Sequence, residues 1–205
     1  MEGSEMGLGA TEPPPFDVLG SEWFASLKRD KQTSVRAAVA GESTELDLSL
    51  SRMTRIPEGV FSTLTVLTKL YLGYCASLTA LPESLGQLQA LTMLNLTYCT
   101  SLTALPESLG QLQALTKLYL NFCISLAALP ESLGQLQALT ILKLYNCSSL
   151  ADESKDLARR LLQCNEKIRD GPSGSPERFH MTTYDFAATI LFGSSSRYGT
   201  GVAKS

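Results

Sequence analysis

The sequence repeats one 24-residue segment three times in succession, and this repetition restricts the fold more than any other feature. The copies span residues 67–138 and read LTKLYLGYCASLTALPESLGQLQA, LTMLNLTYCTSLTALPESLGQLQA and LTKLYLNFCISLAALPESLGQLQA. A partial fourth copy follows at residues 139–150, and a divergent copy precedes them at residues 43–66. Repetition at a fixed period of this length predicts stacked units that bury one shared core.

Each copy divides into two halves with different patterns. In LTKLYL, Leu70 and Leu72 alternate with residues of other kinds, which is the period of a short strand. In ALPESLGQLQAL, Pro82 excludes a strand, and a proline followed by Glu83 favours one short helical turn. The sequence therefore predicts an α/β solenoid, with a short parallel sheet on the concave face and short helical turns on the convex face.

The repeated string LxxLxLxxCxxLxxLPxxLxxLxx resembles the leucine-rich repeat, and this resemblance covers residues 43–150. Its Cys and Leu-Pro positions resemble the 24-residue cytoplasmic type of plant intracellular immune receptors. The resemblance implies a leucine-rich-repeat solenoid and a role in sensing or defence. Receptors of that kind also carry a nucleotide-binding switch domain, but no phosphate-cradling GxxxxGK[ST] motif precedes the repeats here. We therefore expect a free-standing adaptor, a decoy or a fragment.

The segments that flank the repeats predict caps and tails. Residues 1–20 are rich in Gly, Glu and Pro and are expected to be disordered. A helical pattern in residues 21–42 predicts an N-terminal cap, with Trp23 as the side chain that covers the open core. Residues 151–170 form an amphipathic pattern that predicts a helical C-terminal cap. The tail at residues 171–205 is expected to be mostly disordered.

One part of that tail has a different composition. The stretch MTTYDFAATILFG at residues 181–193 is more apolar than a plain linker. It is either a segment that packs weakly on the cap or a short linear docking motif, and the sequence leaves both interpretations open.

Composition and charge exclude several classes of protein. The chain has 205 residues, of which 44% are hydrophobic and 18% charged, with a net charge of −3. Nucleic-acid binding needs a dense basic surface, so we expect no nucleic acid as a partner. The first residues lack the pattern of a signal peptide, and no apolar run is long enough to cross a bilayer. We therefore expect a cytoplasmic monomer, no membrane contact and reduced cysteines.

Catalytic and metal-binding patterns are weak. Four cysteines recur 24 residues apart, whereas zinc sites use close pairs that converge on one point. These cysteines are expected to be buried, one in each coil, and to pair weakly with backbone groups. They are Cys75, Cys99, Cys123 and Cys147. The single histidine, His180, has no predictable partner, and the recurring Glu83, Glu107 and Glu131 predict a solvated face that also suits the starts of the helical turns. We expect no enzyme activity, no cofactor and no metal.

The strand half supplies the candidate binding residues, because every second side chain there faces the concave surface. Tyrosine is frequent among these side chains and is enriched at binding hot spots. Acidic Glu45 and Asp47 precede a series of lysines, which predicts a charge gradient along the face. The candidates are Lys69, Tyr71, Tyr74, Met93, Asn95, Thr97, Tyr98, Lys117, Tyr119, Asn121, Phe122, Ile141, Lys143 and Tyr145.

The differences between the copies favour recognition over a purely structural role for this face. The three full copies differ at six of 24 positions, and four of those six lie in the strand half on the concave face. The polar residues on the helical side are identical in every copy. We therefore predict a non-catalytic module that binds a protein partner through its concave face, in signalling or defence. The alternative is a structural subunit that docks through its C-terminal tail.

Overall fold

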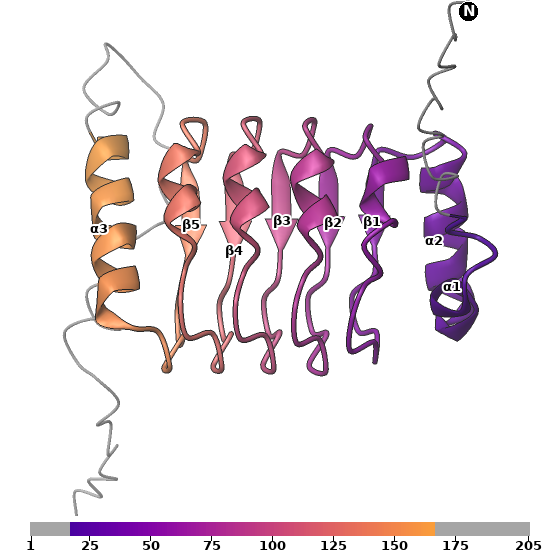
Figure 1. The fold of residues 1–205 in the computed structure, drawn as a ribbon, viewed down its shortest axis with the longest axis horizontal. Coiled ribbons are helices and arrows are strands. Elements are labelled where there is room, and N and C mark those ends of the chain that lie inside the picture. The colour runs from indigo at the N-terminus through magenta and orange to yellow at the C-terminus, as the bar shows by residue number, and fades with distance from the viewer. Residues whose placement is uncertain (1–16, 167–205) are drawn as a thin grey trace, which may run out of the picture.

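The chain folds as a stack of coils, and the computed structural model describes residues 17–166, with side chains described as far as residue 161. Most of the predicted disordered ends lie outside these residues, as do His180 and the segment 181–193. Within the described part, each coil gives one strand to a single parallel sheet with the order β1-β2-β3-β4-β5 (Figure 1). The strands are β1 (Glu45–Asp47), β2 (Lys69–Tyr71), β3 (Met93–Asn95), β4 (Lys117–Tyr119) and β5 (Ile141–Lys143).

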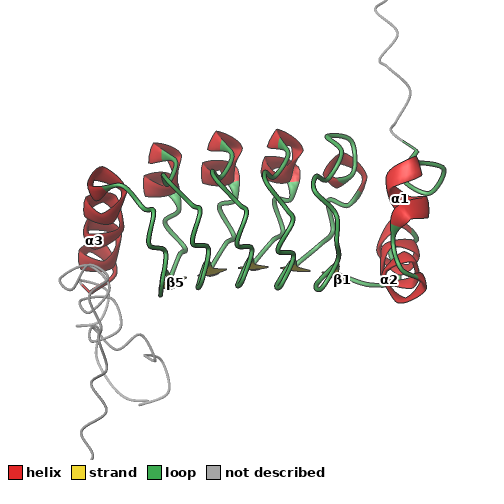
Figure 2. Cartoon of the chain, turned by 90° about the horizontal axis from the view of Figure 1, so that it is seen from below, coloured by secondary structure: helices red, strands yellow, loops and turns green. Residues whose placement is uncertain are grey.

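The helical half of each repeat forms a layer of short 3-10 helices opposite the strands (Figure 2). These are η1 (Phe61–Thr63), η2 (Glu83–Gln87), η3 (Glu107–Gln111) and η4 (Glu131–Gln135). Pro82 caps η2 in an extended conformation, with a φ of −74° and a ψ of 154°. A proline suits this position because its missing N–H is not needed there.

Leucines from both layers fill the space between them. Leu70, Leu72, Leu85 and Leu88 have 0% exposure, and their equivalents in the later coils are also buried. Equivalent positions pair in register, so Leu94 of β3 lies between Leu70 and Leu118. A coil alone would expose this apolar surface, and stacking removes it from water, which is the main stabilising term for such a fold.

The N-terminal end of the stack carries two helices where the sequence suggested one helical segment. Helix α1 (Glu22–Ser26) ends in an extended residue, Leu27, and helix α2 (Arg29–Val39) begins two residues later. The expectation that Trp23 covers the core is met in part, because Trp23 packs against the core but is less deeply buried than its neighbour. Phe24 is the buried aromatic, at 4% exposure, whereas Trp23 is only partly buried against the core.

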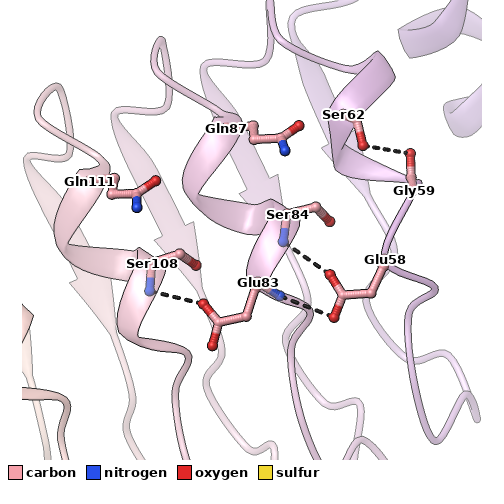
Figure 3. Close-up of a pocket in the computed structure, with 8 residues that line it drawn as sticks. All are labelled: Glu58, Gly59, Ser62, Glu83, Ser84, Gln87, Ser108 and Gln111. Carbon is pink, nitrogen blue, oxygen red and sulfur yellow. Dashed lines mark hydrogen bonds between the residues drawn. The ribbon is translucent and has the colours of Figure 1, made fainter. Parts of the chain in front are cut away.

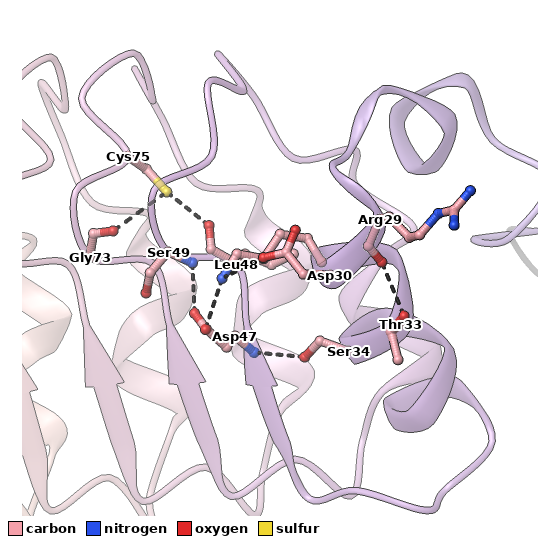
Figure 4. Close-up of polar contacts among 10 residues, drawn as sticks. Arg29, Asp30, Thr33, Ser34, Asp47, Leu48, Ser49, Gly73 and Cys75 are labelled. Atoms are coloured by element: carbon pink, nitrogen blue, oxygen red, sulfur yellow. Dashed lines mark hydrogen bonds and ion pairs between the residues drawn. The ribbon is translucent and has the colours of Figure 1, made fainter.

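Helix α2 packs beside β1 and satisfies its outer edge (Figure 4). The Ser34 hydroxyl accepts the backbone N–H of Asp47 at 3.0 Å. The ammonium group of Lys31, a largely buried side chain, lies 2.8 Å from the Asp47 carboxylate. Partial burial alone would raise the pKa of Asp47, but hydrogen bonds from Lys31 and Ser49 hold it below its usual value.

The C-terminal end is closed by helix α3 (Asp152–Glu166), which lies beyond the last coil in Figure 1. It contacts η4 on the helical side of the stack. The Ser154 hydroxyl accepts the N–H of Leu129 at 2.9 Å, and Ala158 is fully buried. Leu157 and Leu161 are partly buried against the core. Among the described residues, no helix combines the length and the apolar character that crossing a membrane requires.

Candidate functional site

The strands place the predicted binding residues on one face. In each strand from β2 to β5 the central leucine is buried and its two neighbours are partly exposed. All fourteen predicted side chains are at least partly accessible to solvent, and Tyr74 and Tyr145 are the most exposed aromatics, at 55% and 49%. We call this surface the concave face. The structure brings these residues together as columns, because strand pairing aligns each of them with its equivalent in the next coil.

An aromatic column runs along the rim where the strands end, and it consists of Tyr74, Tyr98, Phe122 and Tyr145. The rings of Tyr74 and Tyr98 are stacked with their centroids 4.7 Å apart, and those of Tyr98 and Phe122 with centroids 4.3 Å apart. Tyr145 meets Phe122 edge-on at 5.2 Å. Such pairs contribute about 0.5–1.5 kcal/mol each beyond the area they bury. The column is therefore a rigid, partly exposed apolar stripe.

The backbone under this column adopts a conformation that the sequence did not indicate. Tyr74, Tyr98 and Phe122 have φ values of 60°, 64° and 61°, in the left-handed region. Large side chains rarely occur there, since the conformation costs on the order of 1–2 kcal/mol. The equivalent positions in the first and last coils, Leu50 and Asn146, have φ values of 61° and 57°. Asparagine tolerates this conformation well, so Asn146 was the available clue.

Charge on the concave face is more balanced than the sequence suggested. The Lys69 ammonium lies 2.7 Å from the Glu45 carboxylate, and this neighbour raises the pKa of Lys69. Asp47 is paired with Lys31 of α2. The acidic amino end is therefore largely neutralised by ion pairs. The predicted gradient is weaker than expected, because sequence spacing did not show which charges pair.

The four recurring cysteines connect neighbouring coils. Each thiol donates to the carbonyl oxygen of a leucine 27 residues earlier, at 3.1 or 3.2 Å, and all four are buried. Cys75, for example, donates to Leu48 (Figure 4). Burial raises the pKa of Cys99 to about 12 and that of Cys147 to about 11. No cluster of three or more His, Cys, Asp or Glu side chains in the described part of the chain is arranged to hold a metal ion.

These thiols should resist alkylation in the folded protein. At pH 8 a thiol with a pKa of about 12 carries about a thousandfold less thiolate than one with a pKa of about 9, and burial also blocks access. We expect iodoacetamide to leave Cys99 and Cys147 unmodified under native conditions and to modify both in denaturant, as measured by peptide mass spectrometry. Equal modification with and without denaturant would contradict the buried arrangement.

Glutamates on the convex side have a role that sequence reasoning missed. The Glu58 carboxylate accepts the N–H groups of Glu83 and Ser84 at 3.3 and 3.1 Å, and Glu83 in turn accepts the N–H of Ser108 at 3.0 Å. Each glutamate therefore caps the 3-10 helix of the next coil (Figure 3). The prediction of a solvated face that suits the helix starts did not include these caps, because the contacts join residues 25 or 26 positions apart.

These caps line a shallow pocket of about 490 Å³ on the convex side (Figure 3). Its walls comprise Glu58, Gly59, Ser62, Glu83, Ser84, Gln87, Ser108 and Gln111. The hydroxyls of Ser84 and Ser108 are buried and have no hydrogen-bond partner among the described residues. Both carboxylates already accept backbone N–H groups, and neither accepts a hydrogen bond from a serine hydroxyl of this lining.

The fold is a leucine-rich-repeat solenoid. It is defined by short parallel strands, 3-10 helices on the convex side and columns of buried leucines shared between coils. The sequence comparison agrees, since the family described as leucine rich repeat matches residues 44–102. None of the curated proteins compared with the chain matches it. Domains of this kind generally mediate protein–protein interactions and are typically not catalytic.

Several solved structures are similar to this chain. The leucine-rich-repeat domain of the type III effector XopL is 27% identical, over 49% of this chain and 34% of that one, with a TM-score of 0.42. A leucine-rich-repeat protein of Leptospira interrogans is 27% identical, over 58% of this chain and 38% of that one, with a TM-score of 0.35. The BIR2 ectodomain of Arabidopsis thaliana is 23% identical, over 48% of this chain and 53% of that one, with a TM-score of 0.33. The matches thus span little more than a third of the first two relatives.

Proposed function

We propose that this protein is a non-catalytic module that binds a partner protein through its concave face. The observation that carries the proposal is the location of the differences between the repeats. Four of the six variable positions supply exposed side chains of the concave face, whereas the exposed Glu and Gln residues of the convex side are the same in every full copy. Convex Glu58 and Glu83 cap neighbouring coils, so the glutamates of that side have a structural role.

The chemistry of the face supports a protein as the ligand. A rigid aromatic column flanked by amides and lysines offers both apolar contact and orienting polar groups, as protein interfaces do. Asn95 and Asn121 are already positioned, since their side-chain oxygens accept the N–H groups of Thr97 and Tyr145 at 2.9 and 3.0 Å. A face whose side chains are held in place loses less entropy on binding.

We place this module in the cytoplasm and in signalling or defence. The support is the resemblance of its repeats to those of plant intracellular immune receptors. A monomeric adaptor or decoy that binds a protein without chemistry fits that setting. Capture from native cell extract, followed by identification of the retained protein, tests this part of the proposal.

The concave face is tested by a variant that keeps the fold. Tyr74→Asn and Tyr98→Asn remove two rings from the column while placing a residue that accepts the left-handed backbone, as Asn146 does. With Tyr119→Ser added, we expect about a hundredfold or greater loss of affinity for the captured partner, measured by calorimetry. Tyrosines that a partner buries in an interface are typical hot spots. Far-ultraviolet circular dichroism should be unchanged.

The matched control changes the opposite side. Gln87→Ala and Gln111→Ala alter two exposed convex side chains and should leave the affinity within about twofold. If the partner is still captured by the tyrosine variant but is lost on deleting residues 171–205, the concave face is not the binding surface. The alternative role, a structural subunit docked through its tail, would then be the better description.

A further inference from the structure

The charged side chains of the repeats lie in two separate layers. Residues 67–150 contain three lysines and three glutamates and no other charged residue. Every lysine belongs to a strand, and every glutamate is the first residue of a 3-10 helix. The lysines are Lys69, Lys117 and Lys143, and the glutamates are Glu83, Glu107 and Glu131. Figure 2 shows the strands and the 3-10 helices on opposite sides of the stack, so the repeats are positive on the concave side and negative on the convex side.

Salt screening keeps the two charged sides apart. Packed layers lie roughly 10 Å from each other, whereas salt at physiological strength screens exposed charges over about 8 Å. Glu83 is also held within its own layer, since its carboxylate accepts the N–H of Ser108 at 3.0 Å. A ligand on the concave face therefore meets mainly the charge of the lysines.

The carboxylates of the first coil do not cancel this positive charge along the whole face. The Glu45 carboxylate lies 2.7 Å from the Lys69 ammonium. The Asp47 carboxylate lies 2.8 Å from the ammonium of Lys31 in α2. Lys117 is two coils beyond Lys69 and partly exposed, and no carboxylate in the described part of the chain forms an ion pair with it. Its charge is therefore available to a ligand.

Two asparagines add hydrogen-bond donors to the concave face in a fixed orientation. The Asn95 side-chain oxygen accepts the N–H of Thr97 at 2.9 Å, and the Asn121 side-chain oxygen accepts the N–H of Tyr145 at 3.0 Å. A backbone N–H requires an oxygen as its partner, so the NH2 group of each carboxamide is the end left for a ligand. Both asparagines are partly exposed, and neither NH2 group donates to another residue within 17–161.

We propose that the partner of the concave face presents an acidic segment, whose carboxylates bind Lys117 and the NH2 groups of Asn95 and Asn121. All three groups donate hydrogen bonds, and a carboxylate accepts at both of its oxygens. Lys117 and Asn95 belong to adjacent strands, with their Cα atoms roughly 8 Å apart by strand geometry, so neighbouring acidic side chains can reach both. This inference rests on the proposed function, because it names the chemistry of the ligand on that same face.

A copolymer of glutamate and tyrosine labelled with fluorescein serves as the probe. It combines carboxylates with rings that suit the aromatic column, and a copolymer of lysine and tyrosine is its counterpart of opposite charge. Fluorescence anisotropy with the full-length chain measures both affinities. We expect the acidic copolymer to bind at least about tenfold more tightly than the basic one, and its binding to weaken as the salt concentration rises.

Asn121→Asp is the most discriminating substitution. Aspartate can still accept the N–H of Tyr145, so the local backbone is kept, but a donor is replaced by a negative charge. We expect this variant to bind the acidic copolymer about tenfold more weakly, and Lys117→Gln about fivefold more weakly. The matched control is Gln135→Glu, which makes the same change in net charge at an exposed convex position and should alter the affinity by less than about twofold. Urea denaturation should show cooperative unfolding of all three variants.

Three results would overturn the proposal. Equal weakening by Asn121→Asp and Gln135→Glu would show that only the net charge of the protein matters. Equally tight binding of polyuridylate, with the same dependence on Lys117, would assign the face to polyanions in general. The third result is an acidic copolymer that does not bind, while the tyrosine variant of the concave face still loses the captured partner. In that case the proposed function stands, and the acidic ligand alone is excluded.

Discussion

Replacing Gly110 with alanine should lower the free energy of unfolding by about 2–3 kcal/mol, although the change adds a single methyl group. Gly110 lies in η3, where the next coil approaches closely. An added Cβ would stand 2.4 Å from the Ser132 carbonyl oxygen and 2.5 Å from the Ser132 Cβ. These atoms belong to the backbone and to a short side chain, so neither can rotate away. The two coils would have to separate, which would loosen the packing between η3 and η4.

The chain contains a matched control for this prediction. Gly134 occupies the same position in η4, but no coil follows it, and an added Cβ would meet only the Leu157 Cδ1 atom at 3.9 Å. Gly134→Ala should therefore be neutral or stabilise by about 0.5 kcal/mol, because alanine restricts the unfolded chain. Urea denaturation followed by circular dichroism measures both. Equal effects of the two substitutions would show that close approach between coils does not govern stability.

A second large effect is expected at the centre of the leucine column. Leu118→Ala should destabilise the protein by about 3–4 kcal/mol, within the usual range for a fully buried leucine. Leu118 has 0% exposure and lies between Leu94 and Leu142 in adjoining strands. Collapse around the missing atoms is restricted, since hydrogen bonds to the strands on both sides fix the spacing of the backbone.

The neighbouring position supplies the control for Leu118. Lys117 is partly exposed on the concave face, so Lys117→Ala should change the unfolding free energy by no more than about 0.5 kcal/mol. Urea denaturation compares the two variants under identical conditions. A comparable loss from both would mean that the leucine column is not the main source of stability.

The repeat made the fold predictable, because one period specified strand, turn and short helix in every coil. The alternation around Leu70 and Leu72 identified the strands, and Pro82 marked the start of the helical turn. The cysteines were also placed correctly, as buried groups paired with backbone carbonyls. These features depend on local patterns that recur, so each copy confirmed the interpretation of the others.

Features that depend on contacts between coils were harder to predict from the sequence. Glu58 caps a helix 25 residues further on, and no local pattern marks that relation. The left-handed backbone at Tyr74, Tyr98 and Phe122 was missed because aromatic residues give no signal for it. At the N-terminus, the sequence indicated Trp23 as the side chain that covers the core, and the packed structure shows that Phe24 is buried more deeply. The binding role of the concave residues stays a prediction.

The close fit of one coil against the next has a consequence for the length of the molecule. Residues 91–114 could be removed, and Ala90 would then precede Leu115 in the same sequence context in which Ala114 precedes it now. The new contact would be the one already made between neighbouring coils. It would have the same close approach at the glycine and the same hydrogen bond from the cysteine thiol to a leucine carbonyl. Each gain or loss of 24 residues would therefore change the length of the concave face by about 4.8 Å. The length of the sheet can thus vary in whole steps, with the same contact between neighbouring coils at each step.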